Sequence, residues 1–205
     1  MNRSCILVPL TMLAGLLACG SDGTGPRDDV KTDAELNVLR SSPTSPPLVT
    51  TTASFYARKG EGRELRMYYR PEAGATDSTE FLRFKVNANT LDRRQDGSVI
   101  ADGDSVLISV TVIDASRLIV DFQPSGLRFS TTDPAELRLS FAEANDDINE
   151  DGIVNGEDDS AKAQLAIWRR ETIADPWVRL SSTLSVSSND VRADITGFTN
   201  YAIAY

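Results

Sequence analysis

The chain has 205 residues, of which 30 are acidic and 21 are basic, so its formal net charge is −9. It contains no histidine and only two cysteines, Cys5 and Cys19. The missing histidine excludes catalytic and metal sites that need an imidazole. The lack of a basic block excludes ordinary nucleic-acid binding, because phosphate contacts need clustered Lys and Arg. Hydrophobic residues make up 40% of the chain, which is enough to build a packed core.

Residues 1–18 predict an export signal. Met1–Arg3 is a short positive start, and the apolar run that follows ends at Leu17. This run is too short to span a bilayer as a mature helix, but it has the length of the apolar region of a signal peptide. The sequence Leu-Leu-Ala-Cys at 16–19 resembles the lipobox of bacterial lipoproteins. The resemblance implies cleavage after Ala18 and acylation of Cys19, so that several acyl chains hold the protein in a membrane far more durably than one chain would.

The resemblance to a lipoprotein also implies a location. The residue after Cys19 is Gly20, which does not resemble an inner-membrane retention signal. We therefore expect an envelope protein, anchored in the outer membrane where the cell has one, on either its periplasmic or its outer face. Because Cys5 lies in the removed segment, the mature chain would have no disulfide. The alternative is an ordinary secretory signal with a chance cysteine.

Residues 19–50 are predicted to be a flexible linker. Gly, Ser and Pro cluster at 20–26 and again at 41–47, which argues against packed structure. A flexible chain of about 30 residues has a root-mean-square reach of roughly 30 Å, enough to lift a folded domain clear of lipid headgroups. The weakly apolar segment 34–39 interrupts the linker, and it is compatible with either a short helical turn or an added strand.

Residues 51–205 are predicted to form an antiparallel β-sandwich. Apolar and polar residues alternate with a period of two, and turn signals such as Asp96-Gly97 and Asp102-Gly103 separate the runs. About ten short strands at this spacing favour a sandwich. Trp168 and Trp177 are expected in its core or at the edge of the core. Whether 51–103 forms a separate subdomain stays open. In chain order, the apolar faces are expected at Leu65–Tyr69, Leu82–Val86, Val106–Val112, Leu118–Phe122, Leu127–Phe129, Leu137–Phe141, Leu165–Ile167, Trp177, Val191–Ile195 and Tyr201–Tyr205.

The second half of the chain carries a family resemblance. Its segments 122–129, 135–139, 167–168, 177–180 and 193–202 resemble the ZU-five-type β-sandwich of ankyrins, netrin receptors and many bacterial surface proteins. The resemblance covers 104–205 and implies the same sandwich fold.

Some members of that family cleave themselves at a His-Phe-Ser triplet. Gly197, Phe198 and Thr199 stand at the matching positions. Thr199 is a candidate nucleophile, but glycine replaces the histidine that would activate it. Self-cleavage is therefore not expected, and Phe198 is expected to fill the core.

The strongest local motif is the segment 147–158, which resembles the twelve-residue calcium loop of EF-hands in its dockerin form. In such loops oxygen ligands at positions 1, 3, 5, 7, 9 and 12 surround a hard cation, and glycine at position 6, here Gly152, allows a sharp turn. Val154 at position 8 is expected to pack inward. The resemblance implies a structural Ca²⁺ whose ligands are Asp147, Asn149, Asp151, the carbonyl of Ile153, Asn155 (directly or through water) and Asp158.

This loop also accounts for the acidity of the chain. Eight acidic and no basic residues lie between Glu143 and Asp159. The alternative to a calcium site is a solvated acidic turn between two strands. Only one copy of the motif is present, whereas cellulosomal dockerins use two, so binding to cohesin is not expected.

Taken together, the motifs predict a non-catalytic, membrane-anchored envelope lipoprotein with a calcium-stabilised β-sandwich for interaction or assembly, facing a protein or glycan partner. The alternative is an envelope hydrolase that uses paired carboxylates, such as Asp102 with Asp104 or Asp158 with Asp159. A shifted carboxylate in an apolar cleft would favour the enzyme, and a closed, well-filled sandwich would favour interaction. An outer-membrane barrel is a third class, disfavoured by the charges on outward strand faces.

Overall fold

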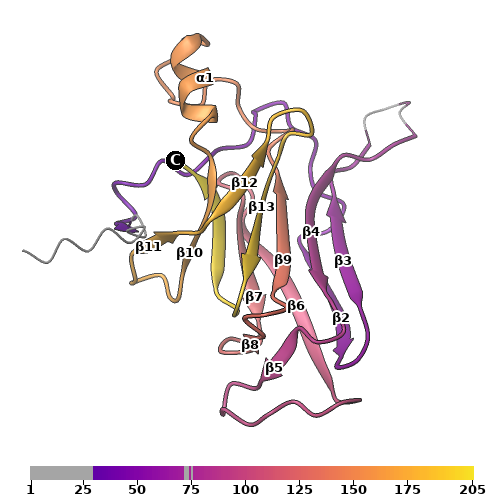
Figure 1. Cartoon of the computed structure of the whole chain (residues 1–205). Helices are drawn as coiled ribbons and strands as arrows, with labels where there is room; N and C mark the ends of the chain where they lie inside the picture. Colours follow the sequence, from indigo (N-terminus) through magenta and orange to yellow (C-terminus); the bar gives the residue numbers. More distant parts are fainter. Residues whose placement is uncertain (1–29, 72–73, 75) are drawn as a thin grey trace, which may run out of the picture.

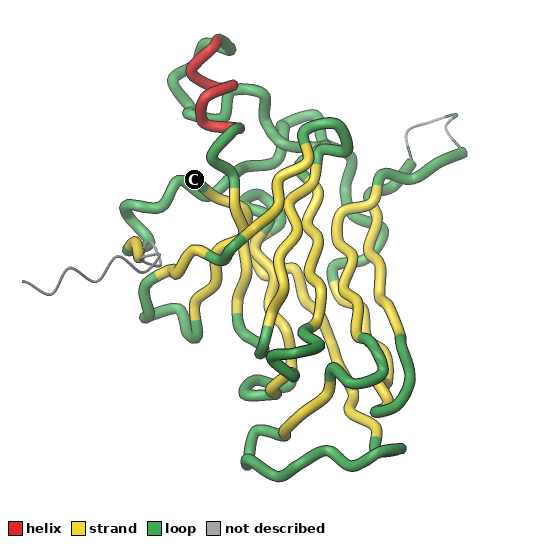
Figure 2. The backbone as a smooth tube through the Cα atoms, in the orientation of Figure 1, coloured by secondary structure: helices red, strands yellow, loops and turns green. Residues whose placement is uncertain are grey.

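The computed structural model describes residues 30–71, 74 and 76–205. Within these residues the chain forms fourteen β-strands and one short helix, and every strand pairing is antiparallel. The predicted all-β sandwich is therefore confirmed (Figure 2). The signal peptide at 1–18, Cys19 and the first part of the linker, 19–29, lie outside the described residues.

Two large sheets form the sandwich (Figure 1). The first has seven strands in the order β1 (Val30–Lys31), β11 (Trp177–Arg179), β10 (Ala166–Arg170), β14 (Asn200–Ala204), β7 (Ile119–Gln123), β6 (Ser105–Asp114) and β2 (Thr52–Arg58). The second has five, in the order β12 (Ser182–Ser185), β13 (Asp190–Ile195), β9 (Ala135–Ser140), β4 (Glu80–Val86) and β3 (Arg63–Tyr68). The short pair β5 (Leu91–Arg93) and β8 (Arg128–Phe129) lies at one end of the sheets, and α1 (Gly156–Lys162) lies at the other (Figure 1).

The inward faces of both sheets meet in one apolar core. On β6, for example, Val106, Ile108, Val110 and Val112 are all buried, as their alternation predicts. Aromatic rings fill the centre of the core. The ring of Phe198 lies 5.1 Å from that of Phe122 and 4.9 Å from that of Phe129, so the prediction that Phe198 fills the core is confirmed. Such ring pairs strengthen packing beyond the area that they bury.

Residues 51–103 are not a separate subdomain, because their strands belong to the same two sheets as later strands. β2 pairs with β6 over seven residues, and β4 pairs with β9. Leu65, Met67 and Phe84 from this part of the chain share one buried cluster with Ile167 and Phe198.

The prediction of a flexible linker over 19–50 is wrong for residues 30–50, which pack along the sandwich. We call residues 30–41 the N-terminal strap. A turn at Thr32 leads into Leu36 and Val38, which are buried against the outer face of the seven-stranded sheet. Leu39 enters the main core, and its backbone N–H donates to the carbonyl of Ile203 in β14 at 2.9 Å. Further on, Val49 bonds the backbone of Tyr68. Burial of these three apolar side chains helps to dock this segment, although its composition resembles a linker.

The strap covers both tryptophans. Trp168 and Trp177 are almost fully buried, as predicted, and they share a second apolar cluster with Leu36, Val38 and Ala202. This cluster lies on the outer face of the seven-stranded sheet, outside the main core. The indole N–H of Trp168 donates to the carbonyl of Ala204 at 3.1 Å.

Asp33 ties the strap to the sheet through its carboxylate. Its Oδ1 accepts hydrogen bonds from Nη1 of Arg170 at 2.9 Å and from Nε1 of Trp177 at 3.0 Å. A second guanidinium, that of Arg117, lies 3.6 Å away. The bond from Trp177, together with the two arginine charges, holds the pKa of Asp33 below its ordinary value, against a smaller opposing effect of burial.

Candidate functional site

The acidic loop 147–158 connects β9 to β10 and leads directly into α1. It is fixed to the body of the protein at three points. Ile148 is buried, and its carbonyl accepts a hydrogen bond from the Tyr205 hydroxyl at 3.2 Å. Glu150 forms an ion pair with Arg40 of the strap. The backbone N–H of Asn145 donates to the carbonyl of Arg40 at 2.9 Å. The loop therefore contacts both the strap and the end of the chain.

The first half of the loop turns around the carboxylate of Asp147. Its Oδ1 accepts from the backbone N–H of Asp151 at 3.1 Å, and its Oδ2 accepts from that of Gly152 at 2.9 Å. Gly152 has a φ of +88°, and a Cβ at this position would meet no atom within 4 Å. The predicted need for glycine is thus confirmed, and it arises from backbone conformation rather than from crowding.

Asn149 and Asp151 follow as a linked pair. Oδ1 of Asn149 accepts from the N–H of Asp151 at 3.1 Å, and its Nδ2 donates to Oδ2 of Asp151 at 3.2 Å. Oδ1 of Asp151 accepts from the N–H of Ile153 at 2.8 Å. The side chains of Asp147 and Asn149 therefore meet at the backbone amide of Asp151, and the side chain of Asp151 bonds the next turn.

Asn155 begins helix α1. Its Oδ1 accepts from the N–H of Glu157 at 2.6 Å, so it is the N-cap residue. Its Nδ2 donates to the carbonyl of Ile153 at 3.3 Å. Two predicted ligands of the second half of the loop therefore contact each other, and the short helix fixes where Asn155 stands.

Asp158 has a backbone role that the ligand pattern did not predict. Its side chain is buried, Oδ1 accepts from the N–H groups of Ile148 and Asn149 at 2.7 and 3.2 Å, and Oδ2 accepts from that of Asn155 at 2.8 Å. The bond from Asn155 and those from the other two amides lower the pKa of Asp158, against the opposing effect of burial. An acidic residue three positions after an Asn cap is the capping-box pattern, which could have revealed this role.

Each of the six predicted ligand residues has an oxygen of the kind that calcium prefers. Ca²⁺ takes six to eight oxygen ligands in proteins. A carboxylate oxygen can accept two hydrogen bonds. Five carboxylate oxygens of the loop accept only one each: the two of Asp147, the two of Asp151 and Oδ2 of Asp158. Each of these oxygens thus keeps a lone pair for a cation.

The carboxylates of the loop do not lie close enough together to hold an ion, however. Among residues 30–71, 74 and 76–205 there is no group of three or more Asp, Glu, Cys or His side chains placed to hold a metal ion. Calcium binding therefore requires the side chains of the loop to regroup, and that cost favours a weak site.

The expectation that Val154 packs inward is wrong. Val154 is 66% exposed and Ile153 is 63% exposed, whereas Ile148 is 7% exposed. The loop extends beyond the end of the sheets beside α1, so its far side faces solvent (Figure 1). Ile148, at the second position of the loop, makes the apolar contact that Val154 was expected to make.

The paired carboxylates of the enzyme hypothesis have other roles. Asp104 forms an ion pair with Arg94 at 3.1 Å and accepts from the N–H of Ala101 at 3.3 Å, so it stabilises a turn. Asp159 is exposed beside the buried Asp158. Every displaced carboxyl pKa in the described part of the chain is displaced downward, the opposite of what a general acid needs. These groups are Asp33, Glu35, Asp96, Asp114 and Asp158.

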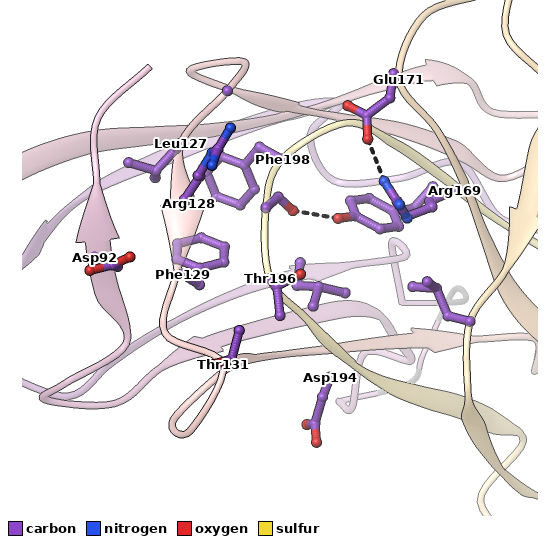
Figure 3. Close-up of a pocket in the computed structure, with 15 residues that line it drawn as sticks. Asp92, Leu127, Arg128, Phe129, Thr131, Arg169, Glu171, Asp194, Thr196 and Phe198 are labelled. Atoms are coloured by element: carbon purple, nitrogen blue, oxygen red, sulfur yellow. Dashed lines mark hydrogen bonds and ion pairs between the residues drawn. The ribbon is translucent and has the colours of Figure 1, made fainter. Parts of the chain in front are cut away.

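A cavity of about 600 Å³ opens beside β8 and the turn between β13 and β14. Figure 3 shows Phe129 and Phe198 on one side of it and Arg169, which forms an ion pair with Glu171, on another. Asp92, Glu171 and Asp194 stand apart from one another around the rim (Figure 3). The rim therefore holds no close pair of carboxylates of the kind that glycoside hydrolysis uses.

Thr199, the candidate nucleophile, comes directly after Phe198, which lines this cavity. Its side chain is buried, and its Oγ1 has no hydrogen-bond partner among the described residues. A nucleophilic hydroxyl needs a base within hydrogen-bond reach, so this position lacks what the reaction requires.

A scan against protein-family models finds no match to the chain, and neither a search of curated proteins nor a search of solved structures finds one. The resemblances to a lipobox, to the ZU-five-type sandwich and to an EF-hand loop therefore depend on the sequence motifs alone. Within the described residues, no helix has the length and apolar character needed to cross a bilayer.

Proposed function

We propose that this protein is a lipid-anchored, non-catalytic component of a bacterial cell envelope, and that its β-sandwich is stabilised by calcium and serves interaction or assembly. The observation that carries the proposal is the geometry of the acidic loop. Asp147, Asn149 and Asp151 converge on one turn, and Gly152 adopts the left-handed conformation that the motif requires.

The charge of the loop supports a cation. Its acids lie in a segment without a base, and Arg40 of the strap forms an ion pair with one of them, Glu150. A bound Ca²⁺ would offset part of this repulsion. Extracellular modules bind calcium with Kd values of about 10⁻⁴–10⁻³ M, a range that suits a structural ion at a cell surface.

The contacts of the loop give the ion a structural role. Through Arg40 and Tyr205 the loop contacts the N-terminal strap and the last strand of the seven-stranded sheet. Stabilising the loop would therefore stabilise the strap, which covers Trp168 and Trp177. The carboxylates around the cavity stand apart from one another, which favours interaction over carboxylate-based catalysis.

The lipid anchor is proposed from the lipobox at Cys19.

Two experiments test the proposal. In cells fed labelled palmitate, wild-type protein should take up label and Cys19→Ser should not, and surface proteolysis should then show which face of the membrane the domain occupies. No label in either protein would remove the lipid anchor. For the ion, calorimetric titration of the full-length protein with calcium chloride should show one weak site that Asp151→Ala loses.

A further inference from the structure

The outer faces of the two sheets differ sharply in charge. On the five-stranded sheet, outward positions carry an ionic lattice, in which Arg66 meets Glu64 and Arg138 meets Asp190. On the seven-stranded sheet, the outward positions of β2, β6 and the end of β7 that lie between Arg58 and Asp121 are uncharged. Asp121 itself borders this surface, since it lies opposite Thr111 and accepts a hydrogen bond from Gln123 at 2.9 Å. We call this surface the hydroxyl face, and it consists of Thr52, Ser54, Tyr56, Ser105, Leu107, Ser109, Thr111 and Gln123.

The register places these side chains in regular rows. Thr52 lies opposite Thr111, and Ser54 lies opposite Ser109, which in turn lies opposite Gln123. Neighbouring strands are about 4.8 Å apart, and alternate residues of one strand are about 6.7 Å apart. The result is a grid of hydroxyl groups on a sheet whose other side is anchored in the core. The amide of Gln123 borders this grid and is bonded to Asp121 and to the backbone of Ser125.

The serine hydroxyls of this grid are free to bind a ligand. Those of Ser54, Ser105 and Ser109 make no hydrogen bond to any other group of the described residues. In contrast, the hydroxyls of Ser98 and Ser116 are engaged in turns, where each donates to an aspartate two residues earlier. Each free hydroxyl can both donate and accept, so the face suits a partner that also carries many hydroxyls.

Tyr56 adds an apolar platform to the grid. It is 61% exposed, and it lies directly opposite Leu107, which is 48% exposed. The negative face of an aromatic ring attracts weakly positive hydrogens, such as the C–H groups on one side of a sugar ring. A neutral saccharide carries C–H groups on a face of its ring and hydroxyls around it. The exposed ring of Tyr56 suits the C–H groups, and the hydroxyls beside it suit the sugar hydroxyls.

The size of the face argues against a protein partner. β2 is seven residues long, so it spans about 23 Å, and three strands span about 14 Å. The footprint is therefore roughly 320 Å², well below the about 800 Å² per partner of a stable protein interface. On the other half of the seven-stranded sheet, the N-terminal strap covers the outer face over Trp168 and Ala202. The exposed face therefore cannot extend in that direction.

From these observations we infer that the hydroxyl face binds neutral polysaccharide. The inference rests on the proposed interaction role and names the class of its partner. Tyr56 stacks on sugar rings, and the hydroxyls of Ser54, Ser105 and Ser109 exchange hydrogen bonds with sugar hydroxyls. The charged outer face of the five-stranded sheet takes no part.

Affinity electrophoresis tests the inference. The full-length protein, in mild detergent, is run in native gels cast with a soluble β-glucan, a galactomannan or a xylan. At least one of these neutral polymers should retard the protein, and Tyr56→Ala should weaken the retardation at least tenfold. The matched control is Tyr68→Ala on β3, on the opposite sheet, which should migrate like the wild type.

Leu107→Ala serves as a second variant, and it should weaken binding less than Tyr56→Ala. Because Tyr56 and Leu107 are exposed, both variants should melt within a few degrees of the wild type. Retardation by none of the three polymers, or retardation unchanged in Tyr56→Ala, would overturn the inference. So would a concentration-dependent dimer that Tyr56→Ala abolishes, since that would identify a second copy as the occupant. Calcium stabilisation and palmitate labelling, measured on the same preparation, report on the proposed function separately.

Discussion

Replacing Asp33 by alanine should undock the N-terminal strap and destabilise the protein by about 2–3 kcal/mol. The substitution removes the acceptor of two hydrogen bonds, from Arg170 and Trp177. Arg170 is 5% exposed and its Nε already has no partner among the described residues. Breaking a buried charge pair costs about 3–5 kcal/mol, but the Asp33 side chain is 51% exposed, so solvent reduces that cost.

Two measurements check this expectation. For a chain of about 150–250 residues, each kcal/mol shifts Tm by about 2–4 °C, so Asp33→Ala should lower Tm by roughly 4–12 °C. Limited proteolysis should cut the variant within the strap, 30–41, before it cuts the sandwich. Asp33→Asn keeps an oxygen that accepts from Trp177, so it should lower Tm less than Asp33→Ala does.

The matched control is Asp77→Ala, which removes an exposed carboxylate elsewhere on the surface. It should leave both the melt and the proteolytic pattern unchanged. If Asp33→Ala melts like the wild type and its strap resists protease equally, the carboxylate does not anchor the strap, and our explanation for the docking of 30–41 is refuted.

Two further predictions concern the loop and the core. Asp158→Asn should lower Tm even in the presence of a chelator, because the carboxylate bonds three backbone amides without any ion. Folding lowers the pKa of Asp158, so its carboxylate should stabilise the fold above about pH 4. This stabilisation should be lost as the pH falls through the lower pKa of the folded state. The Tm values of the wild type and of Asp158→Asn should therefore converge in acid. Phe198→Ala should cost about 3–5 kcal/mol in denaturant unfolding, because it empties the centre of an aromatic cluster; a loss below about 1 kcal/mol would show that the cluster collapses around the gap.

The strand pattern was predictable because alternation fixes which side chains face inward. The residues of β6 show this most clearly, since Val106, Ile108, Val110 and Val112 all face the core. The pairing of β2 with β6 was not predictable, because periodicity says which face is buried and not which strand lies alongside. The same limit hid the union of 51–103 with the rest of the sandwich.

The strap was missed for a different reason. Leu36, Val38 and Leu39 are too few to outweigh the Gly, Ser and Pro around them in a sequence window, yet each is buried. Their docking depends on Asp33 meeting Arg170, residues that lie 137 positions apart. Such distant contacts leave no local pattern to read.

The loop was predicted well in its backbone and less well in its side chains. Gly152 has the expected conformation, whereas Val154 faces solvent and Asp158 caps the backbone. Ligand spacing in a motif specifies which residue types are needed. It does not specify how a single loop, fixed to the body of the protein by Ile148, orients them.

The most direct test of the account is the melting temperature of the full-length protein in millimolar calcium and in chelator. At a calcium concentration of about ten times Kd, binding should add about 1.4 kcal/mol of stability and raise Tm by roughly 3–6 °C. Asp151→Ala should abolish the rise, while Asp159→Ala, which removes an equal charge from the exposed surface of α1, should keep it. An identical Tm in calcium and in chelator, or a rise that survives in Asp151→Ala, would contradict the proposal that this loop binds calcium.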